Sequence, residues 1–282
     1  MKKVFLLLAA VAALTLTACN SKEKQEQERT GGVDVAKENL VAYFPLNSAE
    51  DCVKGEGLSY DANTATFSVG ARGGCYESKG DVNTQAYLKV NVPVTIVKDM
   101  TSFTLSAWIY PNDYRGGIFT LGSSDANVDA NWGAMDLFLD GGDADNGAIL
   151  KGYFFNNNPA ADWHGFYPTA QVVNTLAWQH VVMTYDAATS KLHLYKNGSD
   201  VYEQDVLLGD GKAGAGELQL FNVTCCYIGA FAQRMTGASK EEWLSYFSGK
   251  IDEIRLFNKG LSAAEVSQLY RAEVAVTDGL DK

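Results

Sequence analysis

Apolar and polar residues alternate along much of this chain, and a period of two is the pattern of β-strands with one buried face. The pattern is clearest over 178–198, where two alternating runs flank a polar link. Five apolar residues share one face of this stretch: Val181, Met183, Tyr185, Leu192 and Leu194. Asn197 and Gly198 then favour a tight turn into 201–208. The stretch predicts a hairpin whose register is firmly fixed, because a slip of one residue would turn the apolar set outward.

Similar runs predict further strands, which are separated by Gly, Asn and Asp. They cover 39–46, 66–69, 75–77, 86–90, 100–110, 117–121, 134–139, 149–155, 218–221, 226–230 and 248–258. In the last of these, strict alternation places Ile251 and Glu253 on one side and Ile254 on the other. Capping boxes at 239–242 and 262–265 predict two short helices, the second ending near Arg271.

Many short strands and little helix predict an all-β fold, a two-sheet antiparallel jelly-roll sandwich with a short C-terminal helix. No change of composition divides the sequence between about 35 and 272. We therefore expect one domain over 35–272, followed by a tail at 273–282.

The N-terminus carries Lys2 and Lys3, an apolar run over 4–16, and the sequence Leu-Thr-Ala-Cys at 16–19. This arrangement resembles a bacterial lipoprotein signal peptide with its lipobox, and the apolar run is shorter than a bilayer-spanning helix needs. The resemblance implies removal of residues 1–18 and diacylation of the Cys19 sulfur. Residues 19–34 are then expected to form a lipidated flexible tether, since 21–29 contain no apolar residue.

Two features of the tether predict where the protein is located. Asn20 stands where an Asp would favour retention in the inner membrane, so we expect an outer-membrane lipoprotein. The acidic, glutamine-rich run over 21–29 resembles the export signals of surface lipoproteins in gut Bacteroidetes. That resemblance implies exposure at the cell surface.

The formal net charge is −11, from 23 Lys and Arg against 34 Asp and Glu. Nucleic-acid phosphates are bound through Lys and Arg, so the charge argues against a nucleic-acid partner. Neutral glycans, cationic groups and divalent cations are the compatible partners.

Four cysteines follow Cys19, and a secreted chain meets an oxidising compartment in which disulfides form. Cys52 and Cys75 flank a glycine-rich section, and the sequence leaves open whether they close a local loop or stay free. Cys225 and Cys226 are adjacent, and we expect them on opposite faces of a strand as buried small hydrophobic residues.

Four strings carry a family resemblance: NLVAYFPLN, FTLSAWIYP, WQHVVMTYDAATSKLHLYKNG and GKIDEIRLFNKGLSAAEVSQLY. In this order they resemble the laminin-G-like, concanavalin A-like jelly-roll domains of bacterial surface proteins. The resemblance implies two curved antiparallel sheets with a short helix after the last strand. It implies function less firmly, because this scaffold carries lectins, binding modules of polysaccharide enzymes and structural domains alike.

Members of this superfamily often hold a structural calcium ion where the first and last strands meet. The resemblance places Asn47 and Asp252 at that position, with backbone carbonyls and Asp51 completing the oxygen ligands. Asn47 stands where many members have an Asp, which weakens the charge of the site. The alternative is a loop asparagine and a salt-bridged aspartate with no metal.

Hydrolysis of a glycosidic bond needs two carboxyl groups on either side of it. Glucan hydrolases on this scaffold carry Glu-x-Asp-x-Glu or Glu-x-Asp-x-x-Glu on one strand, and the sequence holds neither pattern. Glu203 and Asp205 begin one, but apolar residues follow. His180 and His193 are expected on the second face of the central hairpin, packed or hydrogen-bonded. We therefore predict no enzyme activity.

The candidate ligand-binding residues are aromatic residues and one histidine in loops rich in Asn, Asp and Gly, where no core needs them. They are Trp163, His164 and Tyr167, with Phe166 beside them, extended by Trp132 and Tyr114. Aromatic rings can stack on the apolar faces of sugars while Asn and Asp bind hydroxyls; the alternative is that the loop caps the sheet. We predict a non-catalytic glycan-binding protein. A structural or adhesive module that binds protein, and a glycoside hydrolase, are the alternatives.

Overall fold

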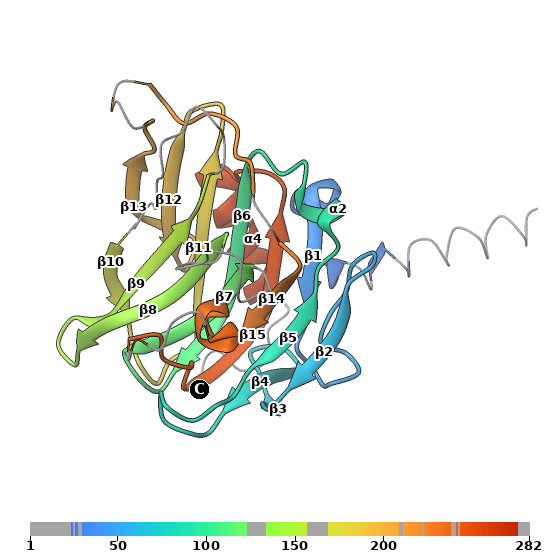
Figure 1. Cartoon of the computed structure of the whole chain (residues 1–282), viewed down its shortest axis with the longest axis vertical. Coiled ribbons are helices and arrows are strands. Elements are labelled where there is room, and N and C mark those ends of the chain that lie inside the picture. Colours follow the sequence, from blue (N-terminus) through green and yellow to red (C-terminus); the bar gives the residue numbers. More distant parts are fainter. Residues whose placement is uncertain are drawn as a thin grey trace, which may run out of the picture.

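The computed structural model describes residues 24, 26, 27, 30–122, 134–156, 169–208, 211, 213–220, 223–237, 241 and 243–275. Two antiparallel sheets, A and B, pack face to face (Figure 1). The predicted fold class is therefore confirmed. Within the described ranges, no helix is long and apolar enough to cross a membrane.

Sheet A has the strand order β13-β12-β11-β6-β15-β4-β3, and β1 also pairs with β15. Its strands are β1 (Leu40–Phe44), β3 (Thr66–Val69), β4 (Gly74–Ser78), β6 (Phe103–Pro111), β11 (Gln179–Asp186), β12 (Lys191–Lys196), β13 (Ser199–Asp205) and β15 (Gly249–Phe257). The last strand of the chain therefore lies inside the sheet and pairs with the first one.

Sheet B has the strand order β10-β9-β8-β7-β14-β5-β2. Its strands are β2 (Ser59–Asn63), β5 (Leu88–Asn91), β7 (Arg115–Gly122), β8 (Met135–Asp143), β9 (Gly147–Phe154), β10 (Thr169–Val173) and β14 (Cys225–Ile228). Strands β2 and β10 are not among those predicted. Residues 218–220, predicted to be part of a strand, have no strand structure.

The central hairpin is β11 and β12, as predicted. Met183 pairs with Leu194, and both are fully buried in the core between the sheets. Asn197 and Gly198 have φ of 50° and 75°, the left-handed conformation that a type I′ turn requires at both positions. Each buried Leu or Met contributes about 1.5–3 kcal/mol, which is why this register is strongly preferred.

Strict alternation is wrong in β15. Ile251 and Ile254 both belong to the core between the sheets. The pairing of β15 with β6 shifts between Asp252 and Arg255, and Glu253 has φ of 50°. This bulge changes the face that each later residue takes. It places Glu253 and Arg255 together on the outer face of sheet A.

The helices agree with the sequence in part. In α4 (Ala263–Val274) the predicted capping box is present, because Ser262 and Glu265 each accept the other's backbone N–H. The helix ends at Val274 rather than near Arg271. Trp243, which follows the capping box at 239–242 and should open the first of the two predicted helices, lies in a turn. The other helices are η1 (Lys37–Asn39), α2 (Val94–Val97) and α3 (Ala232–Thr236).

The outer face of sheet A is covered by α4 and by residues just before β1. Val33 and Val35 join Val266 and Leu269 of α4 in a second apolar cluster on this face. Thr30 is also buried, at 1% exposure. The packed part of the chain therefore begins at about residue 30, inside the segment predicted to be tether.

Candidate functional site

The strands that flank the predicted glycan platform are described, although most of the platform is not. Five of its predicted residues lie outside the described part of the chain: Trp132, Trp163, His164, Phe166 and Tyr167. Strand β7 ends at Gly122, and β8 begins at Met135, which pairs with Phe154 at the end of β9. The chain therefore leaves sheet B toward both predicted loops at one end of the sandwich, which we call the loop end.

Tyr114 lies at the opposite end of sheet B. It precedes Arg115, which pairs with Asp140 where β7 begins. The Tyr114 side chain packs against the core, and its carbonyl accepts the N–H of Gly141 at 2.9 Å. The eight residues of β7 separate it from the loop end by roughly 25 Å. Tyr114 therefore does not extend a platform at the loop end.

A pocket of about 340 Å³ opens beside β1, between that strand, the turn at 54–56 and α2. Its polar lining residues are Lys54, Glu56, Thr95, Asp99 and Asn258, and its apolar lining residues are Leu40, Val41, Ala42, Tyr43 and Ile96, with Gly55 at the turn. Small-molecule sites combine apolar walls with a few polar groups in this way. We call this cavity the β1–α2 pocket.

The β1–α2 pocket lies at the same loop end. Leu40 of its wall pairs with Phe257, which in turn pairs with Thr104 at the start of β6. The neighbouring Phe103 ring packs edge-on against Phe154 at the end of β9, with ring centroids 5.4 Å apart. The pocket and the strand ends that lead to the predicted loops therefore share one end of the molecule.

Asn156, the last described residue before the second predicted loop, is fixed in place. Its side-chain oxygen accepts the N–H of Gln219 at 3.0 Å, and its side-chain nitrogen donates to the carbonyl of Glu217 at 3.5 Å. Asn156 is 1% exposed. The segment at 217–219, predicted in part as a strand, instead holds the base of this loop. No local sequence pattern reveals that role.

The residues at the predicted calcium site do not fit a calcium ion. Asp252 is fully buried, and its two oxygens accept the N–H groups of Arg72 and Glu253, each at 2.9 Å. The Asn47 side-chain oxygen accepts the N–H of Gly74 at 2.9 Å. Calcium needs these oxygens as ligands, whereas here the positive ends of peptide dipoles point at them. Burial, reinforced by Glu253, raises the pKa of Asp252 well above its usual value.

The alternative of a salt-bridged aspartate does not describe Asp252 either, because its partners are backbone N–H groups.

The structure also gives the state of the four cysteines that follow Cys19. Cys52 and Cys75 are free and buried, so the disulfide that the sequence left open is not formed. Cys226 lies in the core between the sheets and Cys225 in a cluster outside sheet B, which confirms their opposite faces.

A buried charged network lies under α4 on the outer face of sheet A. The Arg255 guanidinium donates to Glu273 Oε1 at 2.6 Å, to Glu253 Oε2 at 2.8 Å and to the Thr30 carbonyl at 2.7 Å. All three charged side chains are at most 2% exposed. Burial raises the pKa of both glutamates, and Arg255 opposes that rise. The network joins α4 and the start of the packed chain to β15.

His180 lies in the same network and serves packing. Its ring is 5.4 Å from that of Trp108 and 5.9 Å from that of Tyr270. Its Nε2 is 3.2 Å from Glu273 Oε2, but neither ring nitrogen makes a well-formed hydrogen bond with described residues. Burial, and then the charge of Arg255, lower the pKa of His180 to about 3. The imidazole is therefore neutral and closed off, so it is not a catalytic base.

The two antiparallel sheets, the closing strand paired with the first, and the capped helix after it define a concanavalin A-like jelly roll. Residues 82–267 match the family model Laminin_G_3, described as the concanavalin A-like lectin/glucanases superfamily, and the chain belongs to this family. No curated protein sequence matches the chain.

Solved structures with the same fold include binding domains of two toxins. The binding domain of Paraclostridial Mosquitocidal Protein 1 is 13% identical, with a TM-score of 0.54 over 83% of this chain and 52% of that one. The ligand-binding domain of botulinum neurotoxin serotype D, in complex with N-acetylneuraminic acid, is 12% identical, with a TM-score of 0.53 over 83% and 51%. This chain thus spans about half the length of each. A weaker match is domain 4 of AbnA, an extracellular arabinanase from Geobacillus stearothermophilus, in complex with arabinotriose, which is 17% identical with a TM-score of 0.49 over 82% of this chain and 98% of that one.

Proposed function

We propose that this protein binds glycan at the loop end without transforming it, and that a lipid on Cys19 holds it to the cell envelope. The family joins lectins with glucanases, and the botulinum neurotoxin domain with this fold was solved with a sugar acid bound. The observation that carries the proposal is the β1–α2 pocket, which opens at the end toward which both aromatic loops leave the sheet.

The composition of the pocket suits a sugar. A sugar ring offers hydroxyl groups to polar side chains and apolar C–H faces to hydrophobic ones. Thr95, Asp99 and Asn258 are exposed at the pocket and supply hydroxyl, carboxylate and amide groups. Ile96 and Val41 are half-buried and supply apolar wall. In this proposal Trp163 and Tyr167, which lie outside the described residues, add stacking surface.

One observation favours the second candidate function, a glycoside hydrolase. Two carboxylates, Glu56 and Asp99, line the same pocket, and hydrolysis requires such a pair across the bond. We nevertheless favour binding, because both side chains are exposed and no hydrogen bond to a described residue orients either one. A glycosidase positions its two carboxyl groups far more rigidly.

The proposed anchor is supported by the lipobox at Cys19 and by the place where packing begins. Arg255 and Arg72 bind the carbonyls of Thr30 and Gly31, at 2.7 Å and 2.6 Å. We propose that residues 19–29 link the lipid to this fixed point, in the outer membrane and with the domain on the cell surface. Radiolabelled palmitate should enter the wild type but not Cys19→Ala, and protease treatment of intact cells should remove the domain. A chain that takes up no palmitate would contradict the anchor.

The proposed function is tested on a glycan array with the purified protein and two variants. Thr95→Ala with Asp99→Ala removes polar groups from the pocket, and Trp163→Ala with Tyr167→Ala removes aromatic surface from the loop. Each lost charged hydrogen bond or stacked ring is worth about 1.5 kcal/mol, so we expect at least a tenfold loss of affinity in each variant. Glu203→Gln, on the far hairpin, is the matched control and should bind as the wild type does.

Three results would contradict the proposal. No binding to any glycan together with binding to a protein partner would indicate an adhesive module. Equal binding by the wild type and both variants would place the ligand elsewhere. Release of reducing ends from a polysaccharide panel, lost in Glu56→Gln or Asp99→Asn, would show a hydrolase.

A further inference from the structure

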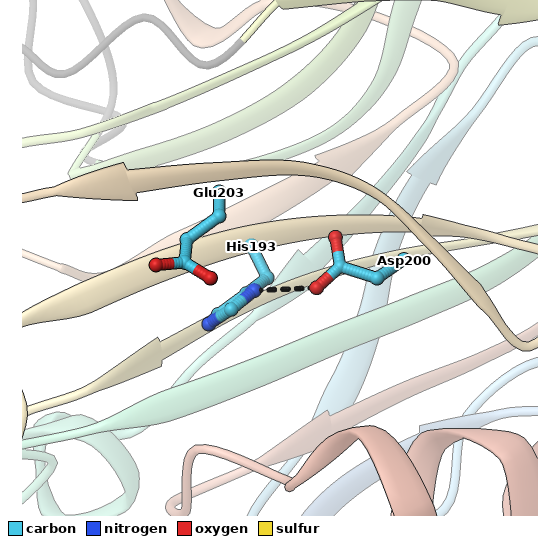
Figure 2. A group of neighbouring side chains, drawn as sticks. All are labelled: His193, Asp200 and Glu203. Atoms are coloured by element: carbon cyan, nitrogen blue, oxygen red, sulfur yellow. Dashed lines mark hydrogen bonds and ion pairs between the residues drawn. The ribbon is translucent and has the colours of Figure 1, made fainter.

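A second group of chemically capable side chains lies on the hairpin of β12 and β13, at the edge of sheet A. His193 pairs directly with Glu203 across the hairpin, and Asp200 pairs with the neighbouring Tyr195. One imidazole nitrogen and two carboxylate oxygens from these residues lie within 4.8 Å of one another. Figure 2 shows the His193 ring between the carboxylates of Glu203 and Asp200, with one ring nitrogen directed at Asp200. We call His193, Asp200 and Glu203 the hairpin triad.

The surrounding contacts already fix the orientation of two of these side chains. His193 Nδ1 lies 2.7 Å from Asp200 Oδ2, and the other Asp200 oxygen accepts the N–H of Tyr202 at 3.1 Å. The His193 ring stacks on the Tyr195 ring, with centroids 5.7 Å apart and planes 27° apart. Partners of this kind, outside the ligands themselves, orient metal ligands in proteins. Two of the three triad side chains are therefore held in place before an ion binds.

The local charge also favours a cation. Lys191 pairs with Glu203 and lies 3.2 Å from Asp205 Oδ1. One ammonium is thus shared by the carboxylates of Glu203 and Asp205, and the carboxylate of Asp200 adds a third negative charge beside Glu203. The triad side chains are 21%, 37% and 51% exposed, in chain order, so a hydrated ion can reach them.

We propose that the hairpin triad binds a divalent transition-metal ion. The imidazole decides the class of metal: oxygen atoms alone suit calcium or magnesium, whereas a nitrogen ligand suits zinc, cobalt or nickel. Three protein ligands leave one position of a tetrahedral zinc ion for water or for a group of a bound molecule. This site is separate from the β1–α2 pocket and does not depend on the proposed function.

The protons and charges balance without any further reactant. In the metal-free protein Nδ1–H of His193 donates to the Asp200 carboxylate, which can only accept. When the ion binds, Nδ1 offers its lone pair, the ring proton moves to Nε2, and Asp200 Oδ2 turns its charge to the ion. Glu203 exchanges Lys191 for the ion, and Lys191 keeps its pairing with Asp205.

Because Lys191 competes with the ion for Glu203, the variants should change zinc affinity in opposite directions. Zinc chloride titrated calorimetrically into the purified, chelator-treated protein should bind at one ion per chain. His193→Ala and Glu203→Gln should each weaken binding at least tenfold. Lys191→Ala removes the competing cation and should tighten binding severalfold. Asp145→Asn, an exposed acid outside the triad, is the matched control and should leave zinc binding unchanged.

A second measurement protects the test against variants that fail to fold. The zinc K-edge absorption spectrum of the wild type should show nitrogen and oxygen ligands only. Sulfur in the spectrum would place the ion on a cysteine and would overturn the proposal. So would equal zinc affinity in the wild type and a folded Glu203→Gln, or calcium binding as tight as that of zinc.

Discussion

His180 and His193 stand on paired strands and on the same face of sheet A, yet their surroundings are opposite. His180 is fully buried under α4, among Trp108, Tyr270 and Glu273. His193 is partly exposed, at 21% of its side chain, beside the more exposed Asp200 and Glu203. Both histidines lie next to carboxylates. The difference is the cover, because α4 and the residues before β1 pack over the part of the face that holds His180.

This comparison shows how the same residue types serve two purposes. Under α4 every charge is paired: Glu253 and Glu273 share Arg255, and Trp108 and Tyr43 complete their hydrogen bonds. On the hairpin the carboxylates outnumber their basic partner and remain reachable. The closed network holds the two ends of the packed chain together, whereas the open group has capacity for a ligand.

The largest effect is expected from breaking the closed network. Glu273→Ala removes the acceptor of both Arg255 Nε and Trp108 Nε1 and leaves a buried guanidinium with one carboxylate fewer. Removing one partner of a buried ion pair typically lowers the free energy of unfolding by about 3–5 kcal/mol. Urea unfolding measures this loss. Glu203→Ala, the matched change in the open group, should cost less than about 1 kcal/mol. Equal losses of stability in Glu273→Ala and Glu203→Ala would show that burial under α4 does not make a carboxylate more important for stability.

The pH dependence of stability should distinguish the two histidines. His180 has a folded-state pKa lowered to about 3 from 6.5. The unfolded chain therefore binds this proton first, so the contribution of His180 is complete above pH 6.5 and is lost as the pH falls toward 3. The free energy of unfolding should decrease by about 1.4 kcal/mol per pH unit in this window. His180→Phe should remove that slope and His193→Ala should keep it; a slope unchanged in His180→Phe would contradict the buried, neutral imidazole.

Calcium should have no measurable effect. The oxygens of Asn47 and Asp252 accept backbone N–H groups, so calcium chloride should leave the melting temperature unchanged at millimolar concentration. Zinc in place of calcium should raise the melting temperature of the wild type but not that of His193→Ala. A rise with calcium that disappears in Asp252→Asn would show that the calcium site predicted from the family exists.

The sequence predicted features that depend on local pattern. The hairpin of β11 and β12, its Asn197-Gly198 turn and the capping box of Ser262 follow from neighbouring residues and are present. Alternation failed at β15, because the bulge at Glu253 depends on pairing with β6 and not on the strand itself. The helix end was missed for a similar reason, since tertiary contacts of Glu273 support the last turn.

The candidate sites depend on contacts between distant parts of the chain, so the sequence predicted them poorly. The β1–α2 pocket draws on four separate segments, at 40–43, 54–56, 95–99 and 258, and no motif links them. Tyr114 looked like part of the platform because its loop has the same composition, but its strand begins at the other end of the sheet. Part of the hairpin triad was within reach, since the turn at 197–198 sets Asp200 opposite Tyr195, two residues from His193. The same turn alone would set Tyr202 opposite His193, so the bulge that brings Glu203 there lay beyond the sequence.

The most direct test of the function is a titration of the purified protein with the glycan that binds best on the array. Isothermal calorimetry on the wild type, on Thr95→Ala with Asp99→Ala, and on Glu203→Gln compares the loop end with the hairpin. We predict at least a tenfold weaker affinity for the pocket variant and an unchanged affinity for Glu203→Gln, with the glycan intact after the titration. An unchanged affinity in the pocket variant, or a cleaved glycan, would contradict non-catalytic binding at the loop end.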